Sequence, residues 1–288
     1  SVVQLSTDDG AILRAYATST NSSAGAIFSY HNTLLGVHPA PVVASFSSRG
    51  PSIDIPGVLK PDILAPGLNI LAAWPPSTAS GQGPFNIISG TSMVTPHVSG
   101  VAALIKGIHP NWSPATIKSA ILTTSNIING TGGSILDEQH RKAGVYDTGA
   151  GHVNPARAAD PGLVYDLSVI DYAGYICWLL GDSGLAIIVR NSSLTCAKLA
   201  KVQEAQLNHP TITVPLASTT GMHFTVNRTV TNVGPADSKF KAKVDVPRSL
   251  TVRVVAETLS FSKTGEKKTF SVSVSSLNWA KSSTWMEP

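Results

Sequence analysis

The spacing of apolar residues changes near Pro210, and this change separates two kinds of fold along the chain. Before it, from residue 41 to about residue 166, short apolar runs alternate with helical patterns, which is typical of βαβ units around a mostly parallel sheet. Beyond it, apolar and polar residues alternate with a period of two, as in Phe270, Val272 and Val274, which is typical of half-buried strands. The sequence therefore predicts an α/β segment followed by a β-sandwich.

Within the α/β segment, two helices are better marked than the strands. One is predicted from about Ser92 to Gly107. The other opens with Ser113 as N-cap and Pro114 at the first helical position, the pairing that helix N-termini favour, and continues to about Thr124. The predicted strands are Val42 to Phe46, Ile63 to Leu64 together with Ile70 to Ala73, and Phe85 to Ile88.

Beyond Pro210, turns at Gly234-Pro235, Pro247 and Gly265 recur at the spacing expected in an immunoglobulin or fibronectin type III-like domain. The stretch before it is irregular, has a helical pattern near Tyr172 to Leu180, and is interpreted as a connector. The inward-facing residues of the predicted strands are Phe224/Val226, Phe240/Ala242/Val244/Val246, Leu250/Val252/Val254, Leu259/Phe261 and Phe270/Val272/Val274.

Composition excludes several classes of function. The net charge of +4 comes from an excess of basic residues in 206–288. There they are scattered, with only Lys267 and Lys268 adjacent, so a nucleic-acid partner is not expected. The apolar run from Val98 to Ile108 is too short to cross a bilayer, so no membrane partner is expected. No cluster of Cys, His, Asp and Glu has ligand spacing, so no metal and no cofactor is expected.

Residues 85–100 combine a strand, a glycine-containing turn and a helix, with Ser92 at the helix start. There, unpaired N–H groups and the positive end of the helix dipole stabilise negative charge on a reacting oxygen, as acyl transfer requires. Gly90 leaves room for a substrate backbone, and Pro96 is expected near the helix start, where losing an N–H costs least. The local pattern fits equally well a simpler role, in which Thr91 and Ser92 only cap a buried helix.

A nucleophilic serine needs a base, and the histidines of the chain offer none from spacing alone. His97 follows Ser92 by five residues, about 140° around the helix and about 7.5 Å along it, so it should point away and serve packing or hydrogen bonding. His152 reaches Ser92 only if the chain folds back, and it remains a minor alternative as the base.

Several sequence blocks occur in one order: APVVASFSSRGP from Ala40, LKPDILAPG from Leu59, NILAAW from Asn69, GTSMVTPHVSG from Gly90, HPNWSP from His109, IKSA from Ile117, GAGHVNP from Gly149 and DPGLVYD from Asp160. Together they resemble the subtilase family of serine proteases, and within it the plant cucumisin-like branch. The resemblance extends over essentially the whole chain.

This resemblance implies a domain order. Residues 1–36 are the tail of an inserted protease-associated domain, 37–167 the C-terminal part of a subtilisin-like catalytic domain, 168–207 a connector and 208–288 a fibronectin type III-like domain. The fold class is then α/β, the C-terminal half of a subtilisin-like parallel-sheet domain, followed by a β-sandwich.

The resemblance also implies a mechanism. Ser92 is the nucleophile that attacks the scissile carbonyl, a histidine is general base and then acid, and an aspartate orients that histidine. An asparagine joins the serine N–H in the oxyanion hole. In the family order these three partners lie upstream of Ser1, and Asp62 and Asp160 match loop positions of the family, not the triad.

The expected function is therefore a serine-type endopeptidase acting on protein or peptide substrates. This chain is expected to be its C-terminal portion, inactive alone and completed by the upstream half of the same protease. The alternative is a non-catalytic truncated paralogue that binds proteins through the fibronectin-like domain. Residues 278–288 stand where the family continues into another strand, which would leave an open sheet edge.

Secretion is expected on indirect grounds. The chain begins at Ser1 without a signal-peptide pattern and is interpreted as a fragment. Two cysteines, Cys177 and Cys196, are expected to pair, from their spacing and from a similar pair in the family. The predicted location is extracellular, in the apoplast or cell wall, for a plant glycoprotein. Asn-x-Ser/Thr acceptor sequences occur at Asn21, Asn111, Asn129, Asn191 and Asn227.

Overall fold

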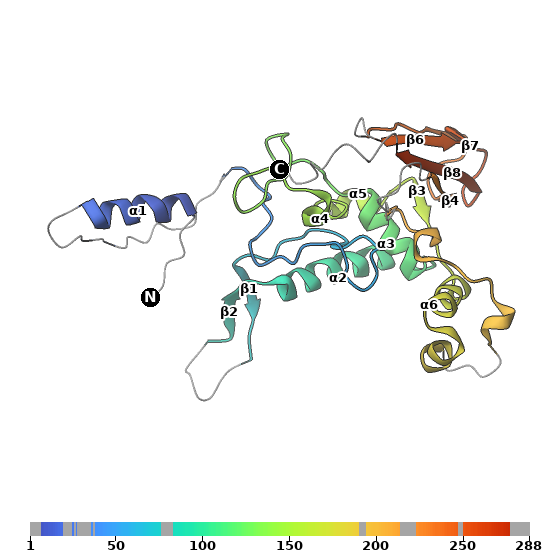
Figure 1. The fold of residues 1–288 in the computed structure, drawn as a ribbon, viewed down its shortest axis with the longest axis horizontal. Coiled ribbons are helices and arrows are strands. Elements are labelled where there is room, and N and C mark those ends of the chain that lie inside the picture. Colours follow the sequence, from blue (N-terminus) through green and yellow to red (C-terminus); the bar gives the residue numbers. More distant parts are fainter. Residues whose placement is uncertain are drawn as a thin grey trace.

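The computed structural model describes residues 7–19, 25, 27, 36, 38–75, 83–189, 194–213, 223–246 and 250–276 (Figure 1). An isolated helix, α1 (Thr7–Ser19), buries none of its residues. Residues 76–82 and 277–288 lie outside the described residues, and so do the turn predicted at Pro247 and the predicted open sheet edge. So do Asn21 and Asn191.

Two helices form the centre of the α/β segment. Helix α2 (Thr91–Ile108) buries Val101 and Ile105 against α3 (Pro114–Thr123). The start predicted for α3 is confirmed, because the Ser113 hydroxyl accepts a hydrogen bond from the Thr116 N–H, 3.0 Å away, and Pro114 is the first helical residue. Their apolar cluster consists of Val101, Ile105, Ile117, Ile121, Val153 and Ala158.

Strand β1 (Ile70–Ala73) pairs antiparallel with β2 (Phe85–Ile88), as a hairpin that leads into α2 (Figure 1). Both strands were predicted. The predicted strand at residues 42–46 differs: Val43 is buried, but the chain turns at once, since the Ser47 N–H donates to the Ala44 carbonyl. In the described residues, parallel pairing is limited to single bridges, Val42 with Leu136 and Leu64 with His152.

Two short helices were not predicted, because each has only four residues and no apolar periodicity. Helix α4 (Val145–Thr148) starts where the Gly144 N–H donates to Asp147. Helix α5 (Pro155–Ala158) is capped by Asn154, whose side chain accepts a hydrogen bond from the Arg157 N–H.

Two sheets make the β-sandwich. One has the order β3-β4-β8-β6, formed by β3 (Leu163–Tyr165), β4 (His223–Asn232), β8 (Lys267–Ser276) and β6 (Leu250–Val255), and the other pairs β5 (Ser238–Lys241) with β7 (Thr258–Phe261). Between them lie Val230, Leu259 and Phe261, with Leu163 and Tyr165 packed against them. Strand β3 comes from the end of the α/β segment, so both parts contribute to one sheet.

The alternation of apolar and polar residues predicted a longer strand than the structure has at β5. The strand ends at Lys241, and although the Ala242 N–H still donates to the Glu257 carbonyl, Val244 and Val246 are 45% and 39% exposed. Alternation therefore continued past the last paired residue.

The connector holds a long apolar helix, α6 (Val169–Val189), and two short 3₁₀ turns, η1 (Cys196–Lys198) and η2 (Glu204–Gln206). By length and composition α6 could cross a membrane, a feature that the sequence prediction overlooked. Its backbone leaves the helical conformation at Gly181, and Cys177 and Leu185 are buried with Cys196 in a small core. The expected disulfide is confirmed: Cys177 bonds Cys196, with Cα atoms 5.4 Å apart.

The chain just after the connector covers the part of the β4 edge that β3 leaves unpaired. The Asn208 side chain accepts from the Thr229 N–H and donates to the Thr229 carbonyl, both at 2.8 Å, as a neighbouring strand would. The Arg228 side chain, 2% exposed, extends from β4 to the same part of the chain and donates to the carbonyls of Ala205 and His209. These bonds fix the connector against the sandwich.

Candidate active site

Ser92 lies in the first turn of α2, two residues beyond the turn that follows β2. Its side chain is exposed, and its backbone N–H has no hydrogen-bond partner among the residues that the structure describes. The first N–H groups of a helix have no intrahelical acceptor and carry its positive partial charge. Ser92 thus combines an accessible hydroxyl with a backbone donor free for an incoming oxygen.

The loop at residues 67–69 holds this turn in place. The Gly90 N–H donates to the Gly67 carbonyl at 2.9 Å, and the Asn69 N–H donates to the Ser89 hydroxyl at 2.8 Å. Position 67 needs glycine, since a Cβ atom there would lie 2.5 Å from a methyl group of Val94. The close approach of this loop to the turn therefore fixes where α2, and with it Ser92, begins.

Pro96 is not where the sequence analysis placed it. Because α2 begins at Thr91, Pro96 is the sixth helical residue and lies inside the helix. Its missing N–H would have donated to the carbonyl of Ser92, four residues earlier. The proline therefore removes the intrahelical partner of the Ser92 carbonyl, at the residue proposed to react.

The two candidate histidines are both accounted for by other contacts. The His97 side chain is exposed and its Nδ1 contacts the Met93 carbonyl at 2.8 Å, the hydrogen-bonding role predicted for it. The His152 Nδ1 contacts the Val153 carbonyl at 3.1 Å, and burial lowers the pKa of its ring below the usual value. Neither histidine bonds the Ser92 hydroxyl, and no described residue does.

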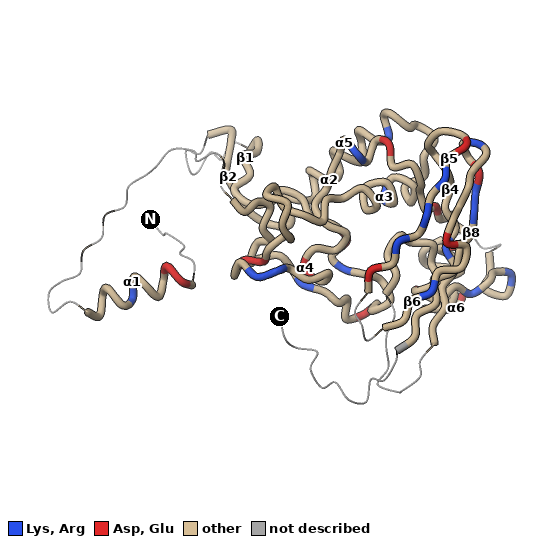
Figure 2. The backbone as a smooth tube through the Cα atoms, turned by 90° about the horizontal axis from the view of Figure 1, so that it is seen from above, with Lys and Arg blue, Asp and Glu red and all other residues tan. Residues whose placement is uncertain are grey.

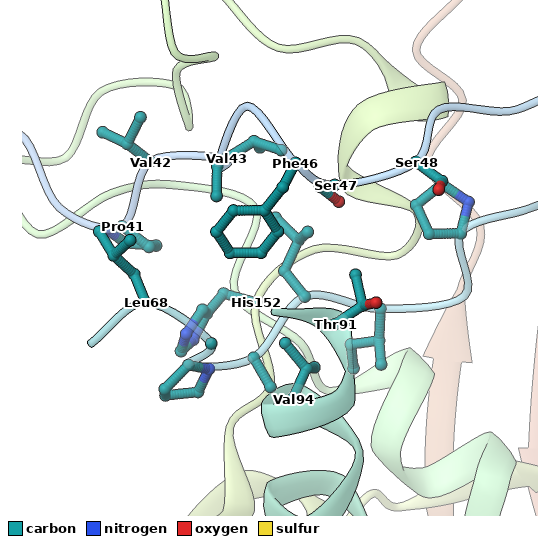
Figure 3. Close-up of a pocket in the computed structure, with 17 residues that line it drawn as sticks. Pro41, Val42, Val43, Phe46, Ser47, Ser48, Leu68, Thr91, Val94 and His152 are labelled. Atoms are coloured by element: carbon teal, nitrogen blue, oxygen red, sulfur yellow. The ribbon is translucent and has the colours of Figure 1, made fainter. Parts of the chain in front are cut away.

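A cavity of about 550 Å³ opens beside the start of α2 (Figure 3). Thr91 and Val94 form one wall, and the ring of Phe46 projects into the cavity from the opposite side, with the His152 ring at its edge (Figure 3). Segments 41–48 and 61–68 supply the other lining residues, most of them apolar. Sequence reasoning missed this cavity, because its walls come from loops that are distant along the chain.

The two aspartates that the sequence analysis kept out of the triad stay out of it. Burial raises the pKa of Asp62, but hydrogen bonds from Lys118 and Lys60 outweigh that effect and hold it below its usual value. The Lys118 Nζ lies 2.6 Å from the carboxylate. Asp160 donates its backbone N–H to Arg157 at the end of α5. Neither carboxylate bonds a histidine among the described residues.

Charge is spread without a basic stripe. Figure 2 shows Lys and Arg interspersed with Asp and Glu over the sandwich and the connector, while the region of β1, β2 and α2 is mostly uncharged. Within the described ranges, no three His, Cys, Asp or Glu side chains are grouped as metal ligands would be.

Comparison with known proteins assigns the family. The family model described as "Subtilase family" matches residues 9–154, and that of a "Fibronectin type-III domain" matches residues 206–287. The chain is similar to the subtilisin-like protease SBT1.6 of Arabidopsis thaliana, 41% identical over 278 residues, which cover 93% of this chain and 36% of that protein. It is also similar to the subtilisin-like protease SBT1.5 of the same plant, 44% identical over 258 residues, which cover 85% and 33%.

The chain spans about a third of the length of the curated relatives it matches. Its α/β segment and β-sandwich agree with the two matched models and confirm the predicted fold class. With a family model matching half of its residues, the chain belongs to the subtilase family of serine proteases.

Proposed function

We propose that Ser92 is the nucleophile of a secreted serine endopeptidase, of which this chain forms the C-terminal portion. The observation that carries the proposal is the position of Ser92: an exposed hydroxyl in the first turn of α2, next to its own unpaired backbone N–H. The simpler role of a cap is not supported, since the N-cap is Gly90 and no side chain caps the helix.

In the proposed reaction the Ser92 Oγ attacks the carbonyl carbon of a peptide bond, and a histidine takes the hydroxyl proton. The carbonyl oxygen becomes an oxyanion, which accepts a hydrogen bond from the Ser92 N–H and is stabilised by the helix dipole. The histidine then protonates the leaving amine, and water releases the acyl group by the reverse sequence. The histidine, its aspartate and the second oxyanion donor belong to the upstream half of the same protein, the proposed partner of this chain.

The exposed apolar residues support such a partner. Leu104 and Ile108 on α2 are 65% and 59% exposed, and Leu71 and Phe85 on the hairpin are 66% and 64% exposed. Large exposed apolar patches mark surfaces that another part of a protein covers. The exposed apolar residues of α2 and of the hairpin are therefore available for contacts with the upstream half.

The test compares three forms of the complete protein. The unchanged protein should hydrolyse a protein substrate and be labelled by a fluorophosphonate, a reagent that reacts with activated serines. Ser92→Ala should lose both properties. Ser99→Ala, which changes an exposed serine two turns further along α2, should keep both. Hydrolysis that survives in Ser92→Ala would refute the proposal.

This chain without the upstream half should be inactive, because no described histidine bonds Ser92. Labelling of the isolated chain at Ser92 would contradict that statement.

The second candidate is a non-catalytic paralogue whose sandwich binds a protein. A blot of the native protein with an antibody against residues 223–276 separates the two. A band far above 30.0 kDa supports the protease, and a single band near the mass of this chain supports the paralogue.

Location and modification are part of the proposal. The Cys177–Cys196 bond supports an oxidising compartment, in keeping with an extracellular glycoprotein of the apoplast or cell wall. Fractionation of the native protein into apoplastic fluid and cell residue tests it.

A further inference from the structure

Three of the five glycosylation sequences lie in the described residues, at Asn111, Asn129 and Asn227, and the structure treats them differently. An N-linked glycan is joined to the side-chain nitrogen of asparagine. The folded protein must therefore leave that nitrogen exposed and free of essential hydrogen bonds. Burial and bonding decide which site meets this requirement.

Asn129 fails it. The residue is 7% exposed, and its Nδ2 donates to the Ser134 carbonyl at 2.8 Å. Its Oδ1 accepts from the Thr131 N–H at 3.0 Å, the Thr131 hydroxyl at 2.7 Å and the Gly133 N–H at 3.1 Å. The side chain closes the loop that it belongs to, and a sugar on its nitrogen has no space. At this position the asparagine and the threonine of the acceptor sequence serve the turn, through hydrogen bonds within residues 129–134.

Asn227 meets the requirement. It lies in the middle of β4, its side chain is exposed on the solvent face of the sheet, and among the described residues that side chain makes no hydrogen bond. Its backbone belongs to the β4–β8 pairing, and its carbonyl accepts a hydrogen bond from Arg228. A strand fixes the direction of each side chain, so Asn227 points outward whether or not it is modified.

The surface around Asn227 is polar. Ser271 faces it across β8, and two hydroxyl pairs flank it, Thr225 with Ser273 and Thr229 with Thr269, each 2.8 Å apart. A hollow of about 300 Å³ adjoins the residue. It is lined by Asp166, Asp171, Gln206, Asn208, Asn227, Thr229, Thr231 and Lys267.

We propose that Asn227 carries an N-linked glycan and that Asn129 carries none in the folded protein. The inference rests on the secretory route proposed above, which supplies the co-reactant, an oligosaccharide joined to a lipid diphosphate. The Asn227 nitrogen bonds to C1 of the first sugar, the bond from C1 to the diphosphate oxygen breaks, and the lipid diphosphate leaves. The amide gives up one proton, and no oxidation occurs.

The donors and acceptors beside Asn227 then face the first sugars, and hydroxyl-rich sugars suit such a surface. Asn111 is also exposed, on the turn after α2, and the fold tolerates a glycan there on the same grounds. The proposal concerns Asn227 because of its polar surroundings.

The consequence concerns binding. A glycan at Asn227 covers the outer face of the sheet β3-β4-β8-β6, so a protein partner of the sandwich must dock elsewhere on it.

The native protein, captured with the antibody against residues 223–276 after unfolding, tests the inference. A peptide N-glycosidase in heavy-oxygen water converts each glycosylated asparagine into a heavy aspartate, which peptide mass spectrometry locates. We expect heavy oxygen at position 227 and unmodified asparagine at position 129. Unmodified Asn227, or heavy oxygen at 129, overturns the inference. If Asn227 is unmodified while Ser92-dependent proteolysis is intact, the inference fails and the proposed activity stands.

Two variants of the complete protein, produced in secreting plant cells, give a second readout. Asn227→Gln should migrate faster on a denaturing gel by one glycan and keep its melting temperature, because the side chain is exposed and makes no hydrogen bond to a described residue. Asn129→Gln should keep its glycan mass and melt at a lower temperature, because four hydrogen bonds are lost. A mass loss in Asn129→Gln, or none in Asn227→Gln, contradicts the assignment.

Discussion

Replacing Arg228 by methionine should destabilise the sandwich strongly. The Arg228 side chain is almost fully buried, 2% exposed, and among the described residues it donates to four backbone carbonyls and to no carboxylate. Burial lowers its pKa to about 10, so it is still charged at neutral pH. The distances are 2.8 Å from Nε to the His209 carbonyl, 3.0 Å from Nη1 to Asn227, and 2.9 and 3.3 Å from Nη2 to Ala205 and Thr211.

Methionine fills a similar volume without donors, so the four carbonyls lose their bonds. Each buried polar group left without a hydrogen bond costs about 1–3 kcal/mol of stability. Part of this loss is offset, because the variant no longer buries a charge without a counter-ion. We expect a net loss of about 3–5 kcal/mol in the free energy of unfolding. Arg228→Lys should recover little of it, since one ammonium group cannot reach carbonyls on several sides.

The measurement is the melting transition of the sandwich in the complete protein, by calorimetry. A loss of about 3 kcal/mol corresponds to about 12 °C or more for a domain of this size. The control is Arg253→Met, which changes an exposed arginine on β6 of the same sheet and should alter the free energy by less than about 0.5 kcal/mol. A melting temperature of Arg228→Met within a few degrees of the control would refute the reasoning.

Two further predictions concern the connector and the residues that directly follow it. Burial, together with the charges of Lys118 and Arg228, lowers the pKa of His209 to about 4, so the folded protein disfavours protonation of this ring. The free energy of unfolding should therefore fall by about 1–2 kcal/mol, after allowance for solvent screening, as the pH falls from about 6.5 to about 4. His209→Gln should flatten this part of the curve in urea unfolding, and an equal slope in both proteins would exclude His209 as the cause. Removal of the disulfide by Cys177→Ser with Cys196→Ser opens a loop of about 20 residues and should cost about 3 kcal/mol; an unchanged unfolding midpoint would show that the connector is held by packing alone.

What the sequence predicted depended on local signals. The start of α3 followed from Ser113 and Pro114, whose chemistry is set within four residues, and the structure confirms it. The hairpin strands at 70–73 and 85–88 and the position of Ser92 at a helix start were equally local. Residues whose role depends on distant contacts were harder to predict.

The apolar run at Val42 to Phe46 has the composition of a buried strand, yet only Val43 is buried, because the next residues turn toward Arg49. Nothing in the local pattern distinguishes these outcomes. The same holds for Arg228, two residues beyond the predicted inward-facing Val226: nothing in the local pattern reveals that carbonyls of residues 205–211 surround it. The same limit applies to the site around Ser92. Its position at a helix start could be predicted from neighbouring residues, whereas the cavity beside it is formed by loops that are far apart in the sequence.

The pairing of β3 with β4 bears on how the protein can be divided. Leu163 and Tyr165 pack against the core of the sandwich, and Gly162 accepts hydrogen bonds from Val233 and Gly234. A fragment cut at the start of the fibronectin-like match, residue 206, would lack this strand and expose the apolar surface that it covers. A separately produced sandwich should therefore begin before Gly162, and the junction of the two parts is a shared sheet, not a hinge.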